Sequence, residues 1–114
     1  NYKTKDGSAI RDYIHVSDLA ISHYLSLKYL IKNNPSQIFN VGFGKGYSVL
    51  EIVKLLKKKL NIKYKITKRR KGDNDYLVSN ISKIKKILRF KPTENIHSIL
   101  DTAINYYKKI NGLW

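Results

Sequence analysis

Cysteine and methionine are both absent from this chain of 114 residues, and histidine is scarce. Without cysteine the chain can form neither a disulfide framework nor a thiolate metal site. The three histidines, His15, His23 and His97, are too widely separated to indicate a ligand cluster, so we expect no bound metal. The missing methionine further indicates that the chain begins partway into a longer polypeptide or has been processed.

Long hydrophobic runs are missing as well. No segment approaches the roughly 18 apolar residues that a membrane-spanning helix needs, and the N-terminus does not resemble a signal peptide. We therefore expect a soluble, cytoplasmic protein without a membrane partner. The length allows one small domain with a modest core and is too short for two domains.

Acidic residues are few, since 8 aspartates and glutamates stand against 23 lysines and arginines and give a formal net charge of +15. A surface this basic attracts nucleic acid, acidic lipid or anionic metabolites. Lysine outnumbers arginine and accompanies many Ile and Asn residues, a bias that an A+T-rich coding sequence produces on any fold. A basic nucleic-acid-binding domain is an alternative, but we expect no nucleic-acid partner because an aromatic-rich recognition motif is lacking.

The apolar periodicity predicts alternating strands and helices, which favours an α/β fold. Extended segments are expected at 13–16, 37–41, 63–67 and 76–79. Helices are expected from residue 17 or 18 to the break at 33–35, after Ser48, over 82–88, and after Thr93. Ser48 and Glu51 fit a capping box, and Thr93 is the expected cap of the last helix. In the first helix, Leu27 and Leu30 are expected on the side that faces the core.

Three alternating glycines, Gly42, Gly44 and Gly46, lie between an expected strand and an expected helix. A dinucleotide-binding loop has the same setting, but its glycines occupy the first, third and sixth positions, and the sixth position here is Tyr47. A Lys-Ser or Lys-Thr pair after the last glycine, as in a Walker loop, is also lacking. We therefore interpret the segment as a turn whose glycines permit positive φ and tight packing.

Two other features resemble catalytic groups. Tyr24 and Lys28 have the Tyr-x-x-x-Lys spacing of a catalytic pair in which lysine lowers the pKa of tyrosine. We expect both at the solvent edge of their helix, because such a short pattern occurs by chance in a chain with nine tyrosines. His15 has no partner at a spacing that would indicate a catalytic or ligand-binding group, and we expect it to be structural.

Three segments in order are far more specific: RDYIHVSDLA from Arg11, NVGFGKGYSV from Asn40, and RRKGD from Arg69. Together they closely resemble the C-terminal third of the UDP-glucose 4-epimerases, in the extended short-chain dehydrogenase/reductase family, and the likeness runs from Asp6 to Trp114. The resemblance implies that the whole chain, 1–114, is a C-terminal fragment. Its implied parts are a substrate loop and short strand at 1–16, a helix and strand at 17–41 that complete the Rossmann nucleotide-binding sheet, and a small α/β UDP-sugar-binding domain at 42–114.

The resemblance also implies three substrate-binding residues. Arg11 and Arg70 match the arginines that contact the diphosphate of the UDP-sugar, and Asp73 matches the carboxylate that accepts hydrogen bonds from the uridine ribose. A guanidinium suits this role because its rigid fork of donors matches phosphate oxygens two at a time. One departure is Leu77, next to Tyr76, where many of these enzymes have a tyrosine.

The activity implied by the resemblance is interconversion of UDP-glucose and UDP-galactose by hydride transfer to and from bound NAD. The NAD loop and the catalytic Ser and Tyr-x-x-x-Lys lie upstream in the family, so we expect no catalytic or cofactor-binding residue here and no turnover by the chain alone. The expected partners are a UDP-sugar and the N-terminal NAD-binding half, whose absence leaves apolar surface on 17–41 exposed. Another nucleotide-sugar epimerase or dehydratase, or an inactive remnant, are the alternatives.

Overall fold

The computed structural model describes residues 2–112, which form four helices and three short strands. In chain order they are β1 (Ile10–Asp12), α1 (Val16–Ile31), β2 (Gly46–Ser48), α2 (Val49–Lys59), β3 (Tyr76–Leu77), α3 (Ser82–Leu88) and α4 (Ile96–Ile110). The sheet has the order β2-β1-β3, with β1 antiparallel to β2 and parallel to β3. This mixed sheet with helices confirms the predicted α/β class.

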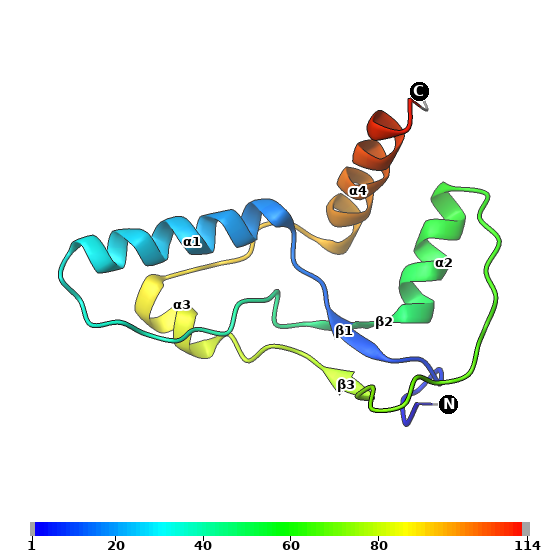
Figure 1. Cartoon of the computed structure of the whole chain (residues 1–114), viewed down its shortest axis with the longest axis horizontal. Helices are drawn as coiled ribbons and strands as arrows, with labels where there is room; N and C mark the ends of the chain where they lie inside the picture. The colour runs from blue at the N-terminus through cyan, green and yellow to red at the C-terminus, as the bar shows by residue number, and fades with distance from the viewer. Residues whose placement is uncertain (1, 113–114) are drawn as a thin grey trace.

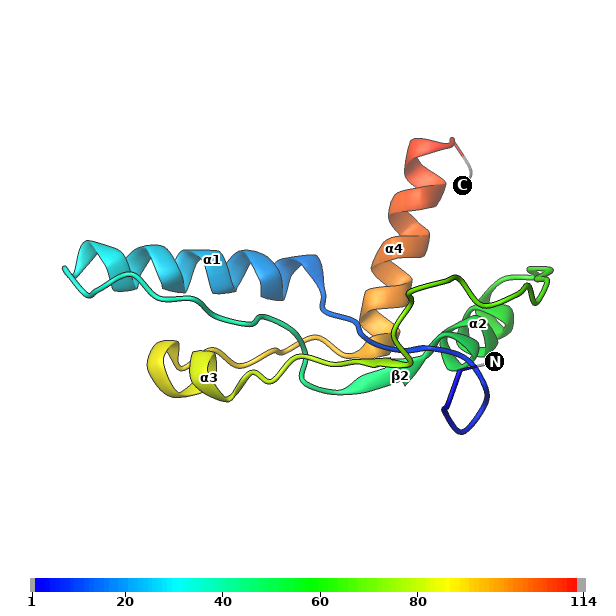
Figure 2. The same ribbon diagram turned by 60° about the horizontal axis from the view of Figure 1, so that its bottom comes forward.

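The helices lie on two sides of the small sheet, and each side has its own apolar cluster. Helix α3 lies below α1 on one side, and α2 and α4 lie on the other (Figures 1 and 2). The first cluster is built on Ile84 and Phe90, and Leu25 and Tyr29 of α1 pack against it. The second cluster comprises Ile52, Ile96 and Leu100. The shape is open: the radius of gyration is 17.0 Å, against about 13 Å for a compact domain of this length.

Helix α1 buries a polar side and exposes much of its apolar side. Asp18 and Ser22 are buried, whereas Leu27 and Leu30 are 56% and 48% exposed. The expectation that these leucines face a core is therefore wrong for the described residues, because α1 touches α3 on its other side, through Leu25. The exposed apolar surface along 17–41 agrees with the expectation drawn from the resemblance.

Asp18 is fully buried and joins α1 to the segment that precedes α4. Its Oδ1 accepts hydrogen bonds from Thr93 N and Thr93 Oγ1, both at 3.0 Å, and its Oδ2 accepts from Glu94 N at 3.1 Å. The prediction that Thr93 caps the last helix is wrong because its hydroxyl is bound to Asp18. Asn95 caps α4 instead, accepting from the backbone N–H groups of the first turn.

The predicted helix over 82–88, the short strand near 76–79 and the capping box of Ser48 and Glu51 are confirmed. The first strand lies at 10–12 rather than 13–16, since His15 already caps α1. The predicted strands at 37–41 and 63–67 are wrong. Neither segment forms a strand, and neither makes a backbone–backbone hydrogen bond to another segment within residues 2–112. None of the helices within residues 2–112 combines the length and the apolar character that spanning a bilayer requires.

Replacing Asp18 with alanine is expected to lower the free energy of unfolding by about 3 kcal/mol, because the fully buried carboxylate and its hydrogen bonds from Thr93 and Glu94 are lost. Urea denaturation followed by circular dichroism measures the change. Asp101→Ala is the matched control: Asp101 pairs with Lys59 at 2.6 Å but is exposed, so its loss is expected to cost only about 0.5 kcal/mol. Equal losses for the two variants would contradict the role given to Asp18.

Candidate functional site

Arg11 lies on the central strand of the sheet, where its backbone is fixed by pairing on both sides. Its Nη2 lies 2.5 Å from Oδ1 of Asp73, and its Nη1 donates to the carbonyl of Ile10 at 2.7 Å. The side chain is 23% exposed. The guanidinium is therefore held in one orientation while keeping contact with solvent.

A short loop, residues 69–75, places Asp73 opposite Arg11. Gly72 has a φ of +80°, which permits the turn before Asp73. Arg69 ties the loop together, because its Nη2 donates to the carbonyl of Asp73 at 2.6 Å and its Nη1 lies 2.9 Å from Oδ1 of Asp75. No sequence pattern pointed to this role of Arg69.

The three predicted substrate-binding residues line one cavity. Its volume is about 410 Å³, and Arg11, Arg70 and Asp73 border it together with Tyr2, Lys68 and Arg69, among others. Within residues 2–112 the side chain of Arg70 has no hydrogen-bond or ion-pair partner. Four cationic side chains against one carboxylate give the cavity a net positive charge, which suits an anionic ligand.

Asp73 is held as a carboxylate by its surroundings. A hydrogen bond from the hydroxyl of Tyr2 is the largest cause that lowers the pKa of Asp73 below its ordinary value, and the guanidinium groups of Arg11 and Arg70 lower the pKa further. The same bond raises the pKa of Tyr2. Because an ionised carboxylate only accepts hydrogen bonds, Asp73 is suited to a ligand that donates them, such as one with hydroxyl groups.

The glycine turn that precedes β2 is filled by Asp12. The carboxylate of Asp12 accepts hydrogen bonds from the backbone N–H groups of Phe43 at 2.8 Å and Gly44 at 3.0 Å, and from that of Ser79 at 3.1 Å. A Cβ added to Gly42 would collide with the same carboxylate. These N–H groups are therefore not available to a phosphate, and Gly44 has the positive φ, +78°, expected of a turn.

The contacts of Asp12 decide whether the glycine-rich segment could hold NAD. The donors that would face a pyrophosphate are bound to Asp12, and the space beside Gly42 is filled by side chains. The described residues therefore do not fit the cofactor there. Asp12 was not singled out from the sequence, because it lies 31 positions before Phe43 and only the fold brings it to the glycine turn.

The remaining motifs are structural or exposed. Tyr24 is 59% exposed and its ring lies 5.3 Å from Nζ of Lys28, so this pair lies on the solvent side as predicted. His15 is buried, accepts from Ser17 N at 3.1 Å and lies 3.1 Å from Oγ1 of Thr102. It is a structural histidine, as predicted. No group of potential metal ligands occurs among residues 2–112.

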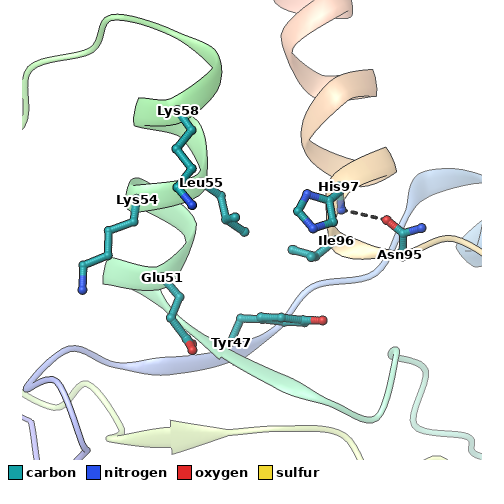
Figure 3. Close-up of a pocket in the computed structure, with 8 residues that line it drawn as sticks. All are labelled: Tyr47, Glu51, Lys54, Leu55, Lys58, Asn95, Ile96 and His97. Carbon is teal, nitrogen blue, oxygen red and sulfur yellow. Dashed lines mark hydrogen bonds between the residues drawn. The ribbon is translucent and has the colours of Figure 1, made fainter.

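A second cavity, of about 450 Å³, lies between α2 and the start of α4 (Figure 3). Lys54 and Lys58 lie on one wall and His97 on the other. The helix-capping side chains around this cavity are already hydrogen-bonded within the fold: Glu51 accepts from Ser48 N, and Asn95 accepts from His97 N. We therefore assign the candidate site to the cavity of Arg11 and Asp73, where charged groups from distant segments converge.

Comparisons with known proteins give a consistent result. The chain is 42% identical over 111 residues to the UDP-glucose 4-epimerase of Lactobacillus helveticus, covering 95% of this chain and 34% of the relative. Its fold matches the UDP-glucose 4-epimerase of Stenotrophomonas maltophila, solved with bound NAD and formylated UDP-arabinopyranose, at a TM-score of 0.91 and 29% identity over 99% of this chain and 34% of that one.

A third similar protein is the UDP-Glc/GlcNAc 4-epimerase of Campylobacter jejuni, with a TM-score of 0.83 and 40% identity over 95% of this chain and 33% of that one. The chain thus spans about a third of the length of the relatives it matches. No protein-family model matches it.

The acid dependence of stability is expected to include a contribution from Asp73. Because its pKa is lower in the folded chain than in the unfolded chain, its ion pairing stabilises the fold above the ordinary aspartate pKa, and this stabilisation is lost as the pH falls through the lowered value. The difference in unfolding free energy between the parent chain and Asp73→Asn is therefore expected to shrink below pH ~4. A difference that stays constant down to pH ~2 would contradict this account; Asp101→Asn is the control.

Proposed function

We propose that the chain, which is 42% identical to a UDP-glucose 4-epimerase over 34% of that relative, belongs to this family, corresponds to the C-terminal third of its members and supplies the UDP-sugar-binding part of such an enzyme. The complete enzyme is proposed to interconvert UDP-glucose and UDP-galactose with bound NAD. The observation that supports this proposal is the convergence of Arg11, Arg70 and Asp73 on one positively charged cavity.

The three residues have distinct proposed roles. Arg11 and Arg70 approach the diphosphate from two segments of the chain, and each offers a planar fork of donors to the phosphate oxygens. Arg11 is oriented by Asp73 and by its own strand, whereas the side chain of Arg70 has no partner among residues 2–112. Asp73 accepts hydrogen bonds from the ribose hydroxyls of uridine. The chain thus binds and orients the nucleotide.

The proposed partner is the N-terminal, NAD-binding part of the enzyme, from the same chain or another one. Residues 17–41 present an exposed apolar surface and, after α1, a segment without strand pairing among residues 2–112, in which Ile38 is 86% exposed. We propose that this region completes the nucleotide-binding sheet, that residues 1–16 form the substrate loop and short strand, and that 42–114 form the small UDP-sugar domain. In this proposal NAD is bound by the partner, and the proposed location is the cytoplasm.

A second candidate substrate is UDP-N-acetylglucosamine. The observation that favours it is the 40% identity to an enzyme described as a UDP-Glc/GlcNAc 4-epimerase. Both substrates share the UDP group that the proposed site binds, so the site does not distinguish between them. The kinetic experiment below is therefore carried out with both UDP-sugars.

In a hybrid enzyme, this chain replaces the matching third of the Lactobacillus helveticus protein. Arg11→Ala and Arg70→Ala are each expected to raise KM for the UDP-sugar at least about tenfold, because a charge-assisted contact to the diphosphate is lost. Arg89→Asn, a change at an exposed arginine in a left-handed position that asparagine tolerates, is the matched control and is expected to leave KM unchanged. Unchanged kinetics in both arginine variants would exclude the proposed diphosphate contacts.

The isolated chain is expected to show no epimerase activity with added NAD, because its described residues do not fit the cofactor at the glycine turn. Adding the separately produced N-terminal two thirds of the Lactobacillus helveticus enzyme is expected to produce turnover, since the apolar surface of α1 is then covered. The readout is conversion of UDP-galactose to UDP-glucose in a coupled assay. Turnover by the chain alone would refute the proposed division between the two parts.

A further inference from the structure

The carboxylate of Asp73 has a different partner on each oxygen. Oδ1 is paired with Arg11, a proposed ligand of the diphosphate. Oδ2 accepts a hydrogen bond of 2.6 Å from the hydroxyl of Tyr2, a residue 71 positions earlier in the chain. Nothing in the sequence motifs pointed to Tyr2, yet it borders the same cavity as Arg11, Arg70 and Asp73.

Tyr2 is fixed in place by contacts other than its hydroxyl group. Its backbone N–H donates to the carbonyl of Gly7 at 3.1 Å, and its carbonyl accepts from Thr4 N at 2.9 Å. Its ring lies 4.7 Å from the guanidinium carbon of Arg69, within the range of a cation–π contact. Since Arg69 also donates to the carbonyl of Asp73, the ring and the hydroxyl of Tyr2 approach the same loop through two separate contacts.

The chemistry of a carboxylate explains what this arrangement can do. An ionised carboxylate has about four lone-pair positions, so the two partners leave about two positions open. With one donor on each oxygen the group cannot rotate freely, and the open positions keep fixed directions. A ligand hydroxyl therefore meets an acceptor that is already oriented, which reduces the entropy lost on binding.

We infer that Tyr2 is a positioning residue for the nucleotide ribose: its hydroxyl orients Asp73 so that the carboxylate accepts from the ribose hydroxyls. This inference rests on the proposed function, because it takes Asp73 as the ribose acceptor. Tyr2 touches the ligand only through Asp73, so its effect is on affinity and on discrimination between ribose and deoxyribose. The chemical step is unaffected.

Tyr2→Phe in the hybrid enzyme removes the hydroxyl and keeps the ring on Arg69. We expect KM for the UDP-sugar and the inhibition constant of UDP to rise about tenfold, the loss typical of one hydrogen bond to a charged group, while kcat stays within about twofold. The parent hybrid is expected to bind 2′-deoxy-UDP or 3′-deoxy-UDP about tenfold more weakly than UDP. In Tyr2→Phe that ratio is expected to fall toward one.

Two further variants separate orientation from folding. Tyr106→Phe, at an exposed tyrosine of α4, removes a hydroxyl elsewhere and is expected to change neither constant. In an Asp73→Asn background, Tyr2→Phe is expected to add no further loss, because both changes interrupt the same contact. Melting temperatures of all variants report on the fold.

The outcomes distinguish this inference from the proposed function. A parent hybrid that neither binds UDP nor turns over would overturn the proposed function and the role of Tyr2 with it. An active parent hybrid whose Tyr2→Phe variant keeps the KM and the UDP to deoxy-UDP ratio would overturn the role of Tyr2 alone. Additive losses for Tyr2→Phe and Asp73→Asn would also overturn it, because Tyr2 would then act independently of Asp73.

Discussion

The site depends on one carboxylate that never faces the cavity. Asp12 follows Arg11 on the central strand and binds backbone N–H groups of both the glycine turn and the segment after β3. Three short segments, none of which has enough residues to form a stable sheet alone, are held together in this way. The position of Arg11 relative to the loop of Asp73 follows from that junction, because β1 is paired in register with β3, close to the loop that bears Asp73.

Acidic and basic side chains have different roles in this molecule. Asp12 and Asp18 accept hydrogen bonds from backbone N–H groups, and Asp73 is paired with arginine and tyrosine. The lysines of α2 and of the connection to β3 are largely exposed. The few acidic side chains therefore fix the geometry, while the abundant basic ones set the long-range field that draws an anion toward the cavity. Lysine-rich composition alone would not have distinguished these two roles.

Much of the fold could be predicted from local signals, and the failures share a physical cause. The capping box of Ser48, the helix over 82–88 and the turn at Gly44 depend on neighbouring residues, so the sequence pattern was sufficient. The segments 37–41 and 63–67 have strand-like patterns, but a strand needs a pairing partner, and periodicity cannot supply one. Arg11, Arg70 and Asp73 line one cavity, and their role in binding substrate stays a prediction from the resemblance. Asp12, Asp18 and Tyr2 were missed because tertiary contacts alone define their roles.

The two separate apolar clusters have a consequence for how the chain unfolds. One cluster belongs to α1 and α3, the other to α2 and α4, and the hydrogen bonds of Asp18 to Thr93 and Glu94 are among the few links from one side to the other. With the apolar core divided in this way, the free energies of local opening on the two sides are expected to differ. Amide hydrogen exchange should then show less protection on the side nearer the uncovered face of α1. A partner that covers this face would be expected to raise that protection.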